Sequence, residues 1–353
     1  MIKNLRIRNF KCYGETGMEI SLARVNFLFG DNSSGKSSFM QFLHIIKETV
    51  CNPETKALVS ALWVDKYVSK IGAQNDWPSC KISGEVTVSK ENAVEEKWNF
   101  GCHKVNNRDA YLLLDESQNL VSERDFGNVM YVYAIAGKEK AKEISSEEFL
   151  KLLNSPSRPD CAVEKIEERE ISHGWRIAPY INDFLRRSGV EYKIVSSSDG
   201  TISHWLVHDN IFDVDVDIDE VGTGVRGLFN LAYVFASWDH GILCVEEPES
   251  NVNERHIGLL TRTMVEEAMK KTNGQLMVEC HSELTALTIK NLVREGIMKP
   301  EDVTIHFAEK TPDGTILHRI HIDENGNFLD KWPNGGFFAE RAKIIDEFYN
   351  IKK

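Results

Sequence analysis

The chain has 353 residues, of which 42% are hydrophobic and 27% are charged, so it is long enough to bury a large core in one elaborated domain or two lobes. Its formal net charge of −12 argues against a general nucleic-acid-binding surface, because affinity for phosphates comes from clustered Lys and Arg, and any DNA contact would need a local basic patch. No run of about 18 apolar residues occurs, so no membrane partner is predicted and a cytoplasmic location is expected.

The N-terminal residues predict a hairpin that leads into a phosphate-binding loop. Residues 1–30 alternate apolar and polar around two glycines, and residues 23–29 form an apolar run of strand length. This strand enters Gly30-Asp-Asn-Ser-Ser-Gly35-Lys36-Ser37, a G-x-x-x-x-G-K-S motif, after which apolar residues recur at helical spacing to about Ile46. A strand, this motif and a helix in that order are typical of a P-loop, which binds a nucleoside triphosphate with Mg²⁺.

The P-loop motif gives each residue type its own task. Backbone N–H groups and the helix N-terminus point at the phosphates, Lys36 reaches the β/γ oxygens, and Ser37 offers its hydroxyl to Mg²⁺. Lys36 is therefore also a predicted catalytic residue and Ser37 a predicted metal ligand. The predicted nucleotide-binding residues of this loop are Gly30, Asp31, Asn32, Ser33, Ser34, Gly35, Lys36, Ser37 and Ser38. A Gly/Ser-rich surface turn is the alternative interpretation.

The middle of the chain separates two predicted halves of a nucleotide-binding α/β domain. Short alternating runs between residues 81 and 120 predict a small antiparallel sheet. Residues 139–190 are rich in Glu, Lys, Arg and Leu with three prolines, and predict a helical insertion. We therefore expect an N-terminal ATPase lobe over 1–135, a helical insertion over 136–190 and a C-terminal ATPase lobe over 191–353.

A second buried strand ends in adjacent carboxylates. Residues 241–249 read Gly-Ile-Leu-Cys-Val-Glu-Glu-Pro-Glu, which is a Walker B pattern. At the end of such a strand one carboxylate orients Mg²⁺ and its waters, and the next polarises the attacking water. Glu246 is thus the predicted metal ligand and Glu247 the predicted catalytic base; an acidic turn that caps a strand is the alternative.

Two further segments are predicted to contact the nucleotide. The strand over residues 275–280 ends in His281, which would lie near the γ-phosphate if this strand is adjacent to the Walker B strand, and is the predicted catalytic switch histidine; a structural histidine is the alternative. A glycine-rich segment over residues 220–227 precedes an apolar helix at 228–236. Such a helix N-terminus can hold an anion, so the predicted ligands are Gly222, Gly224 and Arg226, although a packing turn fits the same residues.

Three other patterns do not predict a site. The seven cysteines are scattered, odd in number and without a C-x-x-C pair, which indicates reduced thiols. The acids of residues 213–219 alternate on one face of a predicted strand, and His204-x-x-x-His208 has metal-like spacing only in a helix, whereas its surroundings alternate like a strand.

The order of these elements, together with Asn9-Phe10-Lys11, resembles ABC-type ATPases of the SMC, RecF and OLD group, within the AAA family. The small bacterial anti-phage branch is similar in Val221-Gly-Thr-Gly-Val225, Glu246-Glu-Pro-Glu249, Glu279-Cys-His-Ser-Glu283 and Trp332-Pro-Asn-Gly-Gly-Phe-Phe338. The resemblance covers both ends and the nucleotide core, but not residues 50–190. It implies a P-loop NTPase fold of ABC/SMC-head type, with a mixed central sheet, an antiparallel β subdomain and a helical insertion.

The same resemblance implies a homodimer in which two heads sandwich two ATP molecules, with the signature of one subunit completing the Walker site of the other. Pairing of dimers into larger rings stays open. Relatives in anti-phage systems control a nuclease or another toxic effector, and since this chain shows no nuclease motif, its effector would be a separate polypeptide.

The chain departs from its relatives in three places. Arg226-Gly227 replaces the usual Ser-Gln of the signature, and Arg226 would then act as a cation on the partner's γ-phosphate. Residues 250–254 lack the usual His-Leu-His-Pro, and an extra glycine interrupts the C-terminal motif. The best region for a Q-loop is 129–135.

These patterns favour a switch ATPase with ATP and Mg²⁺ as its ligands. Two alternatives remain: a nucleotide-binding scaffold that does not hydrolyse ATP, and a P-loop kinase. Release of phosphate separates the switch ATPase from the scaffold. Transfer of phosphate to an acceptor other than water would indicate the kinase.

Overall fold

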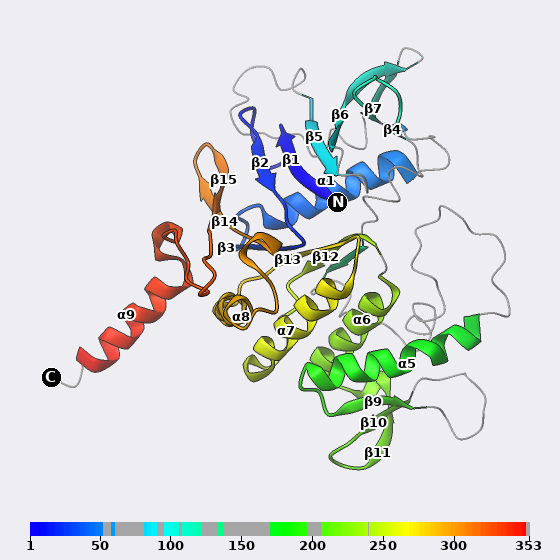
Figure 1. The fold of residues 1–353 in the computed structure, drawn as a ribbon, viewed down its shortest axis with the longest axis vertical. Helices are drawn as coiled ribbons and strands as arrows, with labels where there is room; N and C mark the ends of the chain where they lie inside the picture. The colour runs from blue at the N-terminus through cyan, green and yellow to red at the C-terminus, as the bar shows by residue number, and fades with distance from the viewer. Residues whose placement is uncertain are drawn as a thin grey trace.

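The computed structural model of the chain describes residues 1–51, 58–60, 81–89, 95–105, 108–121, 133–136, 170–195, 206–238 and 240–350. At its centre lies a six-stranded sheet in the order β15-β14-β3-β13-β12-β8 (Figure 1). All neighbours in it are parallel except β14 and β15. The strands are β3 (Val25–Gly30), β8 (Tyr133–Ala136), β12 (Gly241–Glu246), β13 (Gly274–Glu279), β14 (Val303–Thr311) and β15 (Gly314–Arg319).

The inner strands β3, β12 and β13 are buried along almost their whole length. Parallel strands covered on both faces are expected to read as continuous apolar runs, which is how these three appear in the sequence. Strand β13 pairs with β12 on one side and with β3 on the other. The condition set for His281, that its strand is adjacent to the Walker B strand, is therefore met, and the carboxyl end of β13 lies between the P-loop and the Walker B carboxylates.

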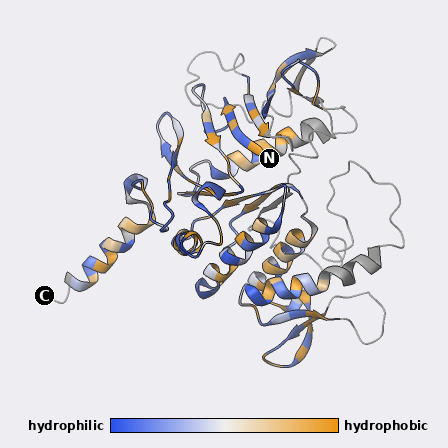
Figure 2. Ribbon diagram, in the orientation of Figure 1, coloured by the Kyte–Doolittle hydropathy of each residue, from blue (hydrophilic) through white to orange (hydrophobic). Residues whose placement is uncertain are grey.

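One face of the central sheet is covered by helices α6 (Thr223–Ser237), α7 (Glu254–Lys270) and α8 (Glu283–Arg294), and α5 (Glu170–Arg187) packs on the outer side of α6 and α7 (Figure 1). Side chains such as Phe27, Val245 and Val278 point into the core on this side. Figure 2 shows hydrophilic and hydrophobic residues mixed along α7, as expected for a helix with one face on the sheet and one in solvent.

The other face packs against α1 (Lys36–Cys51) and an antiparallel sheet. Leu28, Cys244 and Met277 of the central strands belong to this second core. The predicted N-terminal hairpin is confirmed by the pairing of β1 with β2, and the predicted antiparallel sheet by the pairing of β5, β6 and β7. In the order β2-β1-β5-β6-β7-β4, the strands are Met18–Ser21, Ile2–Arg8, Ser83–Ser89, Glu95–Val105, Arg108–Leu114 and Leu58–Ser60.

A small antiparallel sheet of β9 (Tyr192–Val195), β10 (Leu206–Asp209) and β11 (Val214–Asp217) lies beside α5. Of the predicted helical insertion over 136–190, residues 137–169 lie outside the described residues. Helix α5 forms most of the remainder, and its Ile181 and Phe184 are fully buried in the main core. His208 of β10 contacts Asp213 and Asp215, while His204 lies outside the described residues.

The C-terminal segment closes over the P-loop strand. Trp332 is buried, and its ring lies 5.6 Å from that of Phe29 in β3 and 5.8 Å from that of Phe307 in β14. A short 3-10 turn (Pro333–Gly335) then leads to α9 (Gly336–Asn350), which extends away from the body (Figure 1). The Trp-Pro-x-Gly-Phe-Phe-like motif thus packs against the strand that carries the P-loop.

Three predicted boundaries differ from the structure. Helix α1 runs to Cys51 instead of ending near Ile46, since the next proline comes only after Cys51. Helix α6 begins at Thr223, so the glycine-rich segment is itself the first turn of this helix. The acidic strand ends at Asp217, where a 3-10 turn begins. Of the helices in these residue ranges, none is long and apolar enough to cross a membrane.

Candidate functional site

The P-loop between β3 and α1 has a backbone that only glycine fits at two positions. Gly30 has φ = 140° and Gly35 has φ = 102°. A Cβ on Gly30 would lie 2.4 Å from the carbonyl oxygen of Ala308, and one on Gly35 would lie 2.3 Å from the Sγ of Cys12. Both glycines of the motif are therefore required by conformation and by space. The loop leads directly into α1, which begins at Lys36, and a helix N-terminus is a favourable place for an anion.

Two side chains distant in sequence hold this curled backbone. The hydroxyl of Tyr13 donates to the carbonyl oxygen of Gly35 at 3.0 Å, and that of Thr315 donates to the carbonyl oxygen of Ser34 at 2.6 Å. The backbone N–H of Thr315 also donates to the carbonyl oxygen of Cys12. Sequence reasoning missed Tyr13 and Thr315, because nothing in their local patterns shows that they meet the P-loop.

Lys36 lies inside the P-loop and is only 2% exposed. Its Nζ donates to the carbonyl oxygens of Gly30 at 2.8 Å and Asp31 at 2.7 Å. Burial lowers the pKa of this ammonium group. The nearby negative charge of Glu279, and to a smaller extent that of Glu247, acts in the opposite direction. The cation thus lies within the loop and is bonded to carbonyl oxygens of the loop's own backbone.

A carboxylate that carried no predicted role lies beside Ser37. The Ser37 hydroxyl donates to Oε1 of Glu279 at 2.9 Å, and Glu279 is 3% exposed at the end of β13. Glu246 of β12 is the register partner of Glu279. Because register partners point to the same face of a sheet, Glu246 lies on the side of the sheet that bears α1. Glu279 is thus the carboxylate that contacts the predicted metal ligand Ser37, and the predicted metal ligand Glu246 lies one strand further along the sheet.

Glu247 follows β12 in a left-handed backbone conformation, with φ = 45°. Its N–H donates to the carbonyl oxygen of Glu279 at 2.8 Å, and its Oε2 accepts from the hydroxyl of Ser250 at 2.9 Å. This conformation costs a non-glycine residue about 1–2 kcal/mol, and such strain is concentrated at functional sites. Nε2 of His281 lies 3.6 Å from Oε1 of Glu247, so the structure brings the predicted base and the predicted switch histidine together.

The switch loop is tied to the Walker B loop by Glu249, which sequence reasoning also left without a role. The backbone N–H of His281 donates to Oε1 of Glu249 at 2.6 Å. Burial raises the pKa of the Glu249 carboxyl, the carboxylates of Glu247 and Glu279 raise it further, and the bond from His281 acts against them. Its position fixes where the histidine loop begins relative to the Walker B strand.

The signature segment lies apart from this cluster. Gly222 and Thr223 are exposed at the start of α6, and Arg226 is partly exposed. A Cβ on Gly224 would lie 2.2 Å from the carbonyl oxygen of Asn251, so this turn packs tightly against the loop after β12. Of the predicted nucleotide ligands of the signature, Gly222 is exposed, whereas Gly224 and Arg226 are only partly exposed beside that loop. Of the predicted Q-loop region, residues 133–135 belong to β8 next to β12, and residues 129–132 lie outside the described residues.

The residues gathered at the strand ends fit a nucleotide with a divalent cation. Possible ligand atoms of Glu247, Glu279 and His281 lie within 4.8 Å of one another, and Ser37 contacts Glu279. Carboxylate and hydroxyl oxygens are the ligands that Mg²⁺ prefers, and carboxylates packed beside one another are stabilised by a cation. The P-loop and Lys36 supply the complementary site for phosphates.

Comparison with known families agrees with this geometry. Residues 1–168 match a family described as AAA ATPase domain, and residues 298–347 match a protein family of unknown function, DUF3696. The first match extends across residues 50–168, which the motif resemblance did not cover. No protein of curated function matches the chain.

Solved structures extend the similarity to nearly the whole chain. The SMC head domain from Thermotoga maritima is similar at 13% identity with a TM-score of 0.54, covering 91% of this chain and 99% of that one. An SMC head bound to the C-terminal winged-helix domain of ScpA is similar at 12% identity with a TM-score of 0.64, covering 91% of this chain and 98% of that one. An SMC head derived from Pyrococcus furiosus, with an extended coiled coil and bound to the C-terminal domain of ScpA, is similar at 11% identity. Its TM-score is 0.60, and the match covers 99% of this chain and 99% of that one.

The predicted fold class is therefore confirmed: a P-loop NTPase of SMC-head type. Sequence similarity in the N-terminal half and fold similarity over almost the whole length together support an ATP-binding, AAA-type ATPase with an SMC-like head.

Proposed function

We propose that this chain is a switch ATPase that closes into a homodimer around ATP and Mg²⁺, hydrolyses the nucleotide slowly and thereby controls a separate effector. The observation that carries the proposal lies at the carboxyl ends of β12 and β13, where Glu279 contacts Ser37 and has ligand atoms within 4.8 Å of those of Glu247 and His281. Parallel α/β sheets bind their ligands at this end.

Binding rests on the curled P-loop. Backbone N–H groups of the loop and of the first turn of α1 bind the phosphates, and Lys36 neutralises their charge. Ser37 and Glu246 are the proposed ligands of Mg²⁺. When bound, this cation withdraws charge from the phosphate oxygens.

Hydrolysis needs a group that orients water and takes its proton. Glu247 has that place in the proposal, because it follows the Walker B strand and its carboxylate is held by Ser250. His281 lies close enough to Glu247 to position it and to contact the γ-phosphate of a bound nucleotide. The strained backbone of Glu247 fits a group whose orientation matters more than local stability.

The exposed signature supports a dimer. Gly222, Gly224 and Arg226 lie at the start of α6, next to the loop after β12, and in the proposal they complete the nucleotide site of the partner. Arg226 would supply the cation where relatives use a serine. Two of the similar SMC heads were solved with a domain of another protein bound, and the present proposal extends this to an effector of unknown sequence. Control of a nuclease or toxin in anti-phage defence follows from the motif resemblance.

The decisive experiment compares wild type with Glu247→Gln. ATP turnover and solution mass are measured with and without ATP and Mg²⁺. We expect slow turnover by wild type, and a mutant that lacks turnover but stays dimeric with ATP, because Gln keeps the shape of the side chain and loses the base.

Other outcomes point to the alternatives. If wild type binds ATP but releases no phosphate, the changed signature has removed hydrolysis, and the chain is a nucleotide-dependent scaffold. Transfer of labelled phosphate to an acceptor other than water would instead identify a kinase. A wild type that stays monomeric under all conditions would contradict the switch.

A further inference from the structure

We propose that Glu279 is a positioning residue of the magnesium site. Its carboxylate accepts the hydrogen bond of the Ser37 hydroxyl, and this bond turns the oxygen lone pairs of Ser37 toward the cation. This inference rests on the proposed function, since it concerns the same P-loop. It adds a residue that neither the P-loop motif nor the Walker B strand contains.

The hydrogen bond sets the direction of the serine hydroxyl. A hydroxyl has one donor and two acceptor lone pairs, and a metal ligand must offer a lone pair. In this structure the single donor of Ser37 points to Oε1 of Glu279 at 2.9 Å. The lone pairs of Ser37 are then left for a cation. Groups that hold a ligand in this way commonly change metal affinity by about 10–100-fold when they are removed.

The carboxylate is fixed in place by the central sheet. Glu279 is the last residue of β13, which pairs with β12 and β3 on its two sides, and its side chain is 3% exposed. Its own carbonyl oxygen accepts from the N–H of Glu247 at 2.8 Å. One residue thus contacts the P-loop through its side chain and the Walker B loop through its backbone.

The charge of Glu279 gives the proposal an electrostatic signature. Glu279 acts on Lys36, the residue that contacts the phosphates, so it lies within electrostatic range of that site. Without a cation this carboxylate repels the phosphates of ATP, and with a cation bound it attracts the metal. Removing the charge therefore weakens binding of Mg-ATP and leaves binding of metal-free ATP unchanged or tighter. A general distortion of the P-loop would weaken both.

The test is equilibrium binding of ATP, first in EDTA and then over a Mg²⁺ titration, to wild type, Glu279→Gln and Glu279→Ala. We expect the affinity for Mg-ATP to fall about tenfold in Glu279→Gln and further in Glu279→Ala, which also loses the acceptor for Ser37. The affinity in EDTA should not fall in either variant. Thermal unfolding of each variant identifies any protein that has lost its fold, and the Gln variant then decides the result.

Two control variants make the result specific. Thr315→Val removes the bond to the Ser34 carbonyl, and should weaken ATP binding equally with and without Mg²⁺. Ser37→Ala should also weaken binding of Mg-ATP without weakening binding in EDTA. The double variant Ser37→Ala/Glu279→Ala should lose less affinity than the sum of the two single effects, because the two residues share one hydrogen bond.

The possible failures are distinguishable. If Glu279→Gln responds to Mg²⁺ as wild type does, or loses affinity equally in EDTA and in Mg²⁺, the role of Glu279 is wrong while the P-loop proposal stands. If wild type binds ATP under neither condition, both proposals fall.

Discussion

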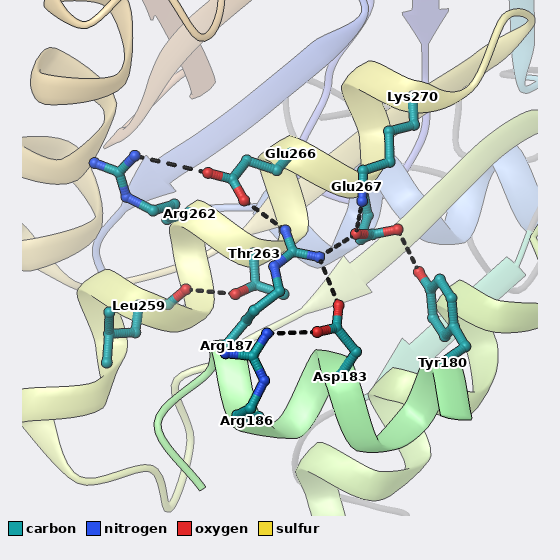
Figure 3. Close-up of polar contacts among 10 residues, drawn as sticks. All are labelled: Tyr180, Asp183, Arg186, Arg187, Leu259, Arg262, Thr263, Glu266, Glu267 and Lys270. Atoms are coloured by element: carbon teal, nitrogen blue, oxygen red, sulfur yellow. Dashed lines mark hydrogen bonds and ion pairs between the residues drawn. The ribbon is translucent and has the colours of Figure 1, made fainter. Parts of the chain in front are cut away.

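Two clusters of charged side chains in this protein are built in opposite ways. One joins helices α5 and α7, and Figure 3 shows its acids and bases alternating. The other lies at the ends of β12 and β13, where acids lie next to acids. The first cluster links two helices through ion pairs, and the second is the candidate nucleotide site.

In the helix cluster each carboxylate meets cations. Arg187 of α5 forms ion pairs with Asp183 of its own helix and with Glu266 and Glu267 of α7. Glu267 also accepts from Lys270 at 2.6 Å and from the hydroxyl of Tyr180 at 2.7 Å. Burial alone raises the pKa of the Glu267 carboxyl, but the bonds from Lys270, Arg187 and Tyr180 outweigh it, so that this pKa lies below its ordinary value.

At the strand ends the pKa of a carboxyl moves the other way. Burial raises the pKa of Glu249, and the charges of Glu247 and Glu279 add to that effect. A buried carboxyl whose pKa is raised by neighbouring acids is unfavourable as an anion by itself and becomes favourable when a cation joins it. The comparison teaches that a cluster in which every acid meets a cation holds a fold together, whereas a cluster in which acids lie beside acids indicates a cationic ligand.

The largest expected effect is at the P-loop. Lys36→Ala removes the cation from its centre and should lower ATP turnover by about 10²–10³-fold, with ATP binding reduced as well, because a buried charge aimed at developing charge is removed. Turnover and equilibrium binding of ATP measure it. Lys97→Ala, at an exposed ion pair on the antiparallel sheet, is the matched control and should leave both unchanged. Normal turnover by Lys36→Ala would contradict the placement of the site.

The next effect is on stability and should leave the site intact. Glu267→Ala removes one carboxylate partner of Arg187. It should lower the free energy of unfolding by roughly 3 kcal/mol, which is the low end for a broken buried ion pair, because the Arg187 side chain is 18% exposed. Chemical denaturation measures this. Asp183→Asn, in a half-exposed pair, should cost less than about 1 kcal/mol. If Glu267→Ala changed the magnesium dependence of ATP binding, the two clusters would be coupled and the contrast between them would be wrong.

The smallest expected effect is on the pH dependence of stability, and it tests the ionised state of Glu267 in the helix cluster. The folded-state pKa of Glu267 is lowered from its ordinary 4.5, so its contribution to stability is fully present above pH 4.5 and is lost as the pH falls through the lower, folded-state value. Wild type should therefore lose more stability than Glu267→Gln as the pH falls below 4.5. Thermal unfolding of both proteins between pH 7 and pH 3 measures the difference, and parallel curves would show that Glu267 is not held as an ion.

Short-range patterns were enough to predict the individual elements. The P-loop, the Walker B strand and the strand before His281 are contiguous segments whose apolar runs, glycines and terminal polar residues can be recognised directly. Helix boundaries were less well predicted: α6 begins at Thr223 because Gly224 packs against the loop after β12, a contact that no local pattern contains.

The sequence by itself determined the P-loop motif, since its glycines, Lys36 and Ser37 lie within the short segment Gly30–Ser37. Only the tertiary structure decided what surrounds them. Glu279 meets Ser37 because β13 lies between β3 and β12, and Thr315 reaches the P-loop from a hairpin 281 residues beyond Ser34. The physical reason is that a side chain near a strand end obtains its neighbours from the order of strands in the sheet, and this order results from packing of the whole core rather than from any local run of residues.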